Sequence, residues 1–135
     1  MYFEMIEKIK PHKLFYSREP ILVCKFDKNL VERIGDDEVY ISEFVVAKIF
    51  GYIPHLIGHL EITKNFLFNL PQYLNNPRKI LMRPDRPNER YLICSVPDHR
   101  IVLEIKRDGG VTQINTIHII REYNLKKLEE KCITL

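Results

Sequence analysis

The C-terminal half of the chain is dominated by strand-like segments joined by short turns. Pro97-Asp98-His99 separates two of these segments, and Asp108-Gly109-Gly110 separates the next two. Turns this short join neighbouring antiparallel strands, because parallel strands need a much longer crossover. The pattern therefore predicts an antiparallel meander of four strands, formed by KILM (79–82), RYLICSV (90–96), RIVLEIKR (100–107) and VTQINTIHII (111–120).

The N-terminal half mixes both kinds of element. A helix is expected over 1–10, ended by Pro11, and strands are expected over 21–26 and 38–41. Ser42 is a good N-cap for a helix that starts at Glu43. Further helical segments are expected over 53–62, 65–76 and 121–131. Together these elements predict one α+β domain over 1–135, with helices packed on one face of a mainly antiparallel sheet of about four strands.

Composition excludes several classes of protein. The apolar share of 45% makes intrinsic disorder a poor description of the 135-residue chain. No apolar run approaches the ~20 residues of a membrane span, and the acidic first residues do not resemble a signal peptide. The odd, widely spaced cysteines favour buried, reduced thiols in a cytoplasmic protein without a membrane partner. These cysteines are Cys24, Cys94 and Cys132.

The net charge of +3 is concentrated in one segment. Residues 78–107 carry eight bases and four acids, whereas the remaining residues carry 13 bases and 14 acids. A local basic surface attracts phosphates more strongly than dispersed charge does. The alternative is a set of ordinary solvent-exposed loop charges around Pro84 and Pro87. The bases are Arg78, Lys79, Arg83, Arg86, Arg90, Arg100, Lys106 and Arg107.

Two histidines, His55 and His59, lie four residues apart, so on a helix they share one face. Such a pair can bind zinc, but no third ligand follows at a suitable spacing, and the sequence does not predict a metal site. The remaining interpretations are a structural role at the edge of the core and general acid–base chemistry.

Strand alternation predicts a second group of polar residues. Over 111–120 it places Thr116 and His118 on the same face as Ile114, and over 100–107 it places Lys106 beside Glu104. The distance between Lys106 and the Thr116–His118 pair depends on the strand register, which the sequence leaves open.

The order of these features resembles the phage-associated branch of the barnase–EndoU–colicin–RelE superfamily of small nucleases. The similarity covers roughly residues 42–121 and runs through IPHLIGHLEI, NFLFNLPQYLNNPRKI, RYLICSV, IVLEIKRDGG and VTQINTIHII. It implies a helix pair on a curved four-stranded sheet, with residues 1–41 as an N-terminal addition to a core over 42–135. It also implies metal-independent RNA cleavage without a cofactor, with His59, Lys106 and Thr116 as the family's site residues.

The resemblance leads to a hypothesis for each remaining residue. His55 and His118 are additional imidazoles that could share proton transfer with His59. Tyr91 could stack on a base of single-stranded RNA. The expected function is an endoribonuclease of phage or mobile-element origin, toxin-like, with RNA and an immunity or antitoxin protein as partners. The alternative is a non-catalytic nucleic-acid-binding or phage assembly module, and the oligomeric state stays open. The residues expected to bind RNA are Arg83, Arg86, Arg90, Tyr91 and Arg107.

Overall fold

A computed structural model describes residues 1–59 and 61–135. The helices are α1 (Tyr2–Lys8), α2 (Lys28–Ile34), α3 (Glu43–Ile49), α4 (Lys64–Phe68), α5 (Leu70–Leu74) and α6 (Glu122–Lys131). The strands are β1 (Ile21–Lys25), β2 (Glu38–Ile41), β3 (Pro77–Met82), β4 (Glu89–Cys94), β5 (Ile101–Asp108), β6 (Val111–Ile119) and β7 (Ile133–Thr134). The α+β class and the four strands of the predicted meander are confirmed.

The sheet is larger than predicted. It has seven strands in the order β1-β2-β6-β5-β4-β3-β7, so the expected sheet of about four strands is wrong. The antiparallel meander β3–β6 forms its centre, β2 pairs with β6 in parallel, and β7 pairs with β3. A four-stranded meander leaves unpaired backbone groups along its two edges. Here the N-terminal strands cover one edge, and the end of the chain covers the other.

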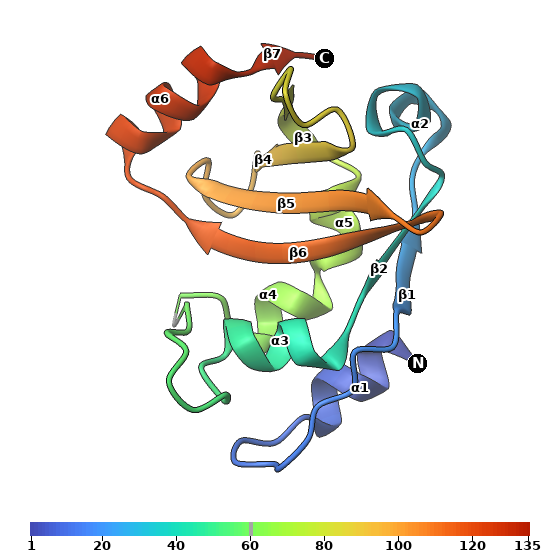
Figure 1. Cartoon of the computed structure of the whole chain (residues 1–135), viewed down its shortest axis with the longest axis vertical. Coiled ribbons are helices and arrows are strands. Elements are labelled where there is room, and N and C mark those ends of the chain that lie inside the picture. Colours follow the sequence, from blue (N-terminus) through green and yellow to red (C-terminus); the bar gives the residue numbers. More distant parts are fainter. Residues whose placement is uncertain (60) are drawn as a thin grey trace.

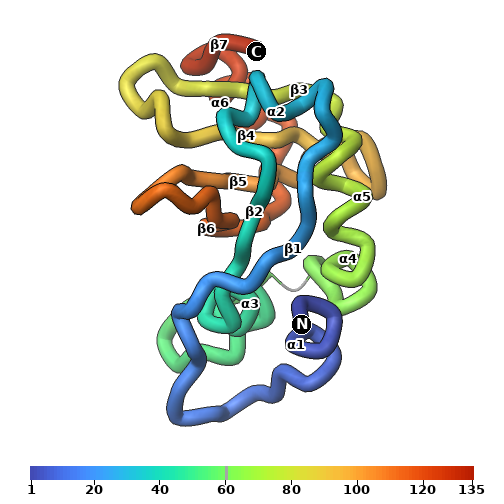
Figure 2. The backbone as a smooth tube through the Cα atoms, turned by 90° about the vertical axis from the view of Figure 1, so that its right-hand side faces the viewer, coloured from blue at the N-terminus to red at the C-terminus, as the bar shows by residue number. Residues whose placement is uncertain are grey.

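The sheet is strongly twisted. Figure 2 shows β1 and β2 running along the long axis of the molecule, while β3 to β6 cross it almost at right angles. Because β2 pairs with β6, residues before 42 contribute strands to the same sheet as the meander.

The two faces of the sheet are covered unequally. Helices α1 to α5 contribute side chains to one large apolar core on what we call the closed face, for example Ile6, Leu30, Ile49, Leu67 and Leu74. Helix α6 lies apart from α1, α3 and α4 (Figure 1) and packs on the opposite, open face, with a small cluster around Leu125. The prediction that helices pack on one face is therefore wrong for α6.

Helix α3 starts where its sequence predicts. The Ser42 hydroxyl accepts a hydrogen bond from the backbone N–H of Val45 at 3.2 Å, which satisfies one of the unpaired donors of the first turn.

The predicted helix over 53–62 is wrong, because its described residues up to His59 form a loop; its position 60 lies outside the described residues. Gly51 has a φ of 74°, a conformation that turns the chain out of α3. Gly58 then returns against Gly51, so closely that a Cβ on Gly58 would lie 2.4 Å from the Gly51 nitrogen. This close approach of two glycines replaces the expected helix.

No helix in the described part of the chain is both long enough and apolar enough to cross a membrane.

Candidate acid–base cleft on the open face

Three central strands place polar side chains in register on the open face. Glu104 on β5 lies opposite Tyr91 on β4 and opposite Thr116 on β6. One row further along, Lys106 lies opposite Glu89 and Gln113. Directly opposed side chains in a sheet have Cβ atoms about 4.5–5.5 Å apart. The register therefore places Lys106 one row from Thr116, on the same face.

A histidine lies in the row on the other side of Glu104, away from Lys106. Val102 on β5 lies opposite His118 on β6, so His118 is a diagonal neighbour of Glu104 on the open face.

A β-bulge changes the predicted alternation of β6. The register shifts between Glu104 and Ile105, so that Glu104 pairs with Thr116 but Ile105 pairs with Ile114. Ile114 therefore faces the closed core, and the prediction that it shares a face with Thr116 is wrong. One extra residue in a bulged strand reverses the alternation beyond it.

Tyr91, Glu104 and His118 of this face line a cleft of about 330 Å³ between the sheet and α6, whereas Lys106 and Thr116 lie beside it on the same face. Its floor is the open face, and α6 provides the facing wall. The cleft is lined by Arg83, Tyr91, Val102, Glu104, His118, Ile120, Asn124, Lys127, Leu128 and Lys131.

Glu104 is the carboxylate at the centre of the cleft floor. Burial raises its pKa, and the negative charge of Glu89 raises it further. The positive charges of Arg86 and Lys48 oppose this effect. A raised pKa makes a carboxylate a stronger base, which is a property of catalytic general bases. Strand alternation predicts Glu104 on this face but gives it no role, and the only signal in the sequence is an acid between the apolar residues Leu103 and Ile105.

His118 and His59 form the second titratable group. Their ring centres lie 5.9 Å apart. Burial lowers the pKa of His118, and the neighbouring His59 lowers it further. The loop holds His59 in place, because its backbone N–H donates to the Ile49 carbonyl at 2.7 Å. The two histidines thus meet although 59 residues separate them in the chain.

Cations surround the two groups. Arg83 enters the cleft and also contacts Asp85 at 3.3 Å. Arg86 lies 3.8 Å from Glu89. Lys48 on α3 donates to the Asn115 carbonyl at 3.0 Å, at the bulge.

Of the predicted site residues, Arg83, Tyr91 and His118 line the cleft, Lys106 and Thr116 lie beside it on the same face, and His55, Arg90 and Arg107 lie elsewhere. His55 is exposed, has a φ of 67°, and does not line this cleft. The Arg90 side chain donates to the Arg33 carbonyl at 2.8 Å, and Arg107 contacts Asp36 at 2.9 Å. Both arginines line a separate hollow beside α2. They bind the chain's own backbone and carboxylate there, so the structure does not bring them to Tyr91 and Arg83.

Comparisons with protein-family models, with curated proteins and with solved structures found no match to this chain. Among the residues that the structure describes, no group of three or more His, Cys, Asp or Glu side chains is arranged to hold a metal ion.

Proposed function

We propose that the protein is a metal-independent endoribonuclease whose active site is the cleft on the open face. The observation that carries this proposal is the diagonal placement of Glu104 and His118 on the floor of one cleft that cations also line. Glu104 has a raised pKa and His118 a lowered one, so the two pKa values move toward each other, which suits a pair of groups that exchange protons with one substrate. The family resemblance of residues 42–121 supports the same chemistry.

The reaction has a defined proton balance. Glu104 takes the proton from the 2′-hydroxyl, whose oxygen attacks the adjacent phosphorus. The bond between phosphorus and the 5′-oxygen breaks, and His118 gives its proton to that oxygen. The products are a 2′,3′-cyclic phosphate and a free 5′-hydroxyl.

The remaining groups stabilise charge and position the substrate. The phosphorane carries extra negative charge, which Arg83 and Lys106 neutralise. Thr116, next to Glu104, hydrogen-bonds a phosphate oxygen. His59 lies beside His118 and adds to the effect of burial, which lowers the pKa of this acid.

The test is RNA cleavage in EDTA by the wild-type protein and by Glu104→Gln and His118→Gln. We expect wild-type products that end in 2′,3′-cyclic phosphate. Each substitution should reduce kcat by about 10²–10⁴-fold, the usual contribution of one general acid or base. Glu32→Gln, on the exposed surface of α2, is the matched control and should cleave normally.

Two results would contradict the proposal. Full activity of Glu104→Gln would remove Glu104 as the base. A wild-type protein that binds RNA but leaves it intact would favour the non-catalytic nucleic-acid-binding module instead.

We also propose a cellular location, an origin and a protein partner. RNA as substrate and three free cysteines support a cytoplasmic location. The family resemblance supports a phage or mobile-element origin and an inhibitory protein partner.

A further inference from the structure

Helix α6 presents a row of polar side chains to the candidate active site, although it lies outside the segment that carries the family resemblance. Asn124, Lys127 and Lys131 all line the cleft. Residues three or four apart in a helix share one face, so this row is continuous. It faces Glu104 and Arg83 across the cleft.

The charge of this wall suits a polyanion. Three cations line the cleft, namely Arg83, Lys127 and Lys131, and Glu104 is the one acidic side chain among the described lining residues. Tyr123, one turn before Lys127 on the same helix, is 67% exposed and has the Lys127 ammonium 4.6 Å from its ring centre. Cations beside an exposed aromatic ring are typical of surfaces that bind single-stranded nucleic acids.

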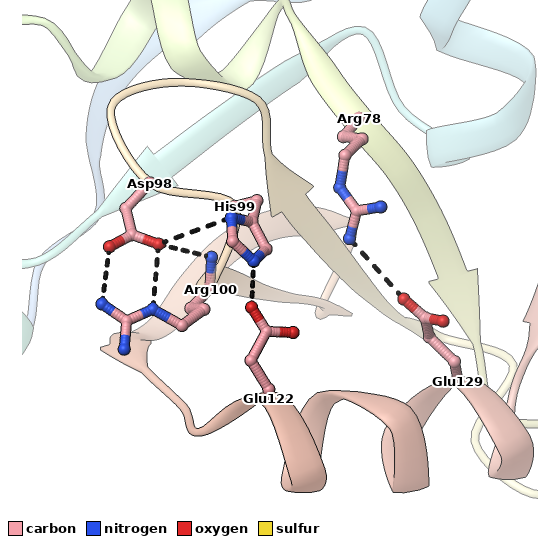
Figure 3. A network of polar contacts seen from close by, with 6 residues as sticks. All are labelled: Arg78, Asp98, His99, Arg100, Glu122 and Glu129. Atoms are coloured by element: carbon pink, nitrogen blue, oxygen red, sulfur yellow. Dashed lines mark hydrogen bonds and ion pairs between the residues drawn. The ribbon is translucent and has the colours of Figure 1, made fainter.

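Helix α6 is held in place along its length, as Figure 3 shows. Glu122 at its start pairs with His99, and Glu129 near its end lies 3.6 Å from Arg78. The same Glu129 carboxylate lies 3.4 Å from Lys79.

Between these ion pairs, Leu125 is buried in the open-face cluster with Tyr91 and Val102, and Leu128 packs against it. Beyond the helix, β7 pairs with β3. The wall is therefore a fixed part of the fold.

The volume of the cleft limits what can enter it. A volume of about 330 Å³ is at the small end of ligand sites. A space of this size suits one unstacked nucleotide better than a base pair held within a duplex.

We propose that α6 is the second wall of the RNA site, where Lys127 and Lys131 bind a backbone phosphate next to the scissile one and the helix restricts the substrate to single strands. This inference rests on the proposed function for the identity of the ligand. It assigns α6 a role in binding and leaves the chemical step to the sheet.

The test measures binding without cleavage. The probe is a fluorescent single-stranded RNA oligonucleotide with 2′-O-methyl sugars throughout, which removes the attacking hydroxyl, and it is titrated by anisotropy at several salt concentrations. The variant is Lys127→Gln with Lys131→Gln, and the matched control is Lys126→Gln, exposed on the same helix but outside the cleft. Thermal unfolding of each protein establishes that it is folded.

We expect the double variant to bind at least about five-fold more weakly at 0.1 M salt. The slope of log affinity against log salt should fall by about 0.7 for each lysine, or about 1.4 in total. The control should keep the wild-type slope. In a parallel cleavage assay the double variant should show a raised KM and an unchanged kcat, and a perfectly paired duplex should be resistant.

The outcomes separate this inference from the proposed function. A reduced salt slope with no cleavage by the wild type would support the α6 site and contradict the ribonuclease. An unchanged slope would overturn the α6 site even in an active enzyme. Equal binding of duplex and single strand, or no RNA binding by the wild type, would overturn it as well.

Discussion

The two faces of the sheet are built from the same strands but differ in what they bury. The closed face meets five helices in one continuous apolar core. The open face meets one helix and carries partly buried acids, bases and a histidine pair beside a small apolar cluster. Charged groups at such positions cost stability, and that cost is acceptable only because the closed face supplies most of the burial.

Two neighbouring residues of β5 show this contrast most directly. Leu103 is fully buried in the closed core, whereas Glu104 points into the cleft. Alternate positions of a single strand thus contribute to stability on one face and to the candidate site on the other.

The largest expected effect is on the closed face. Leu103→Ala removes a fully buried side chain and leaves a cavity, so the free energy of unfolding should fall by about 3 kcal/mol. Urea unfolding measures this value. The protein that remains folded should keep the wild-type kcat, and a large loss of kcat in the folded fraction would contradict the separation of the two faces.

The corresponding change on the open face should cost less. Leu125→Ala truncates a buried residue of the small α6 cluster, next to an open cleft, and should reduce the free energy of unfolding by about 2 kcal/mol. The same urea titration allows direct comparison with Leu103→Ala. An equal or larger loss would mean that α6 is as important to stability as the closed core.

Glu104→Gln should change stability in the opposite direction. Because folding raises the pKa of Glu104, its ionised form destabilises the folded state at neutral pH. This penalty begins to shrink as the pH falls through the folded-state pKa and is gone below the ordinary pKa of about 4.3. The variant should therefore be slightly more stable than the wild type at pH 7, and the difference should shrink toward pH 4.3. Urea unfolding at both pH values tests this, and a less stable variant at pH 7 would contradict it.

The smallest effect concerns His59. Its charge lowers the pKa of His118, so His59→Gln should raise that pKa and move the alkaline limb of the kcat/KM profile to higher pH. NMR titration of the His118 ring gives the same shift independently of activity. His55→Gln, in the exposed part of the loop, is the control and should leave the His118 titration unchanged.

Much of the secondary structure could be predicted from local sequence. Two short turns specify the antiparallel order of β4, β5 and β6, and Ser42 marks the start of α3. These predictions succeed because turn geometry and helix capping depend on residues close together in the chain. The helix predicted over 53–62 fails because the contact of Gly58 with Gly51 is a backbone packing event that apolar periodicity does not report.

The site could be predicted only in part. Alternation places Glu104 beside Lys106 and Thr116 beside His118, but the bulge that aligns Glu104 with Thr116 leaves no mark in the sequence.

The sequence by itself determined the α+β class, the meander and the local excess of positive charge, because these follow from short-range patterns and composition. Tertiary structure alone decided the seven-stranded sheet, the meeting of His59 with His118, and the position of α6 over Glu104. Each of these joins residues far apart in the chain. Strand register and edge pairing are chosen by burial and by backbone hydrogen bonds in the whole fold, and no local pattern specifies them.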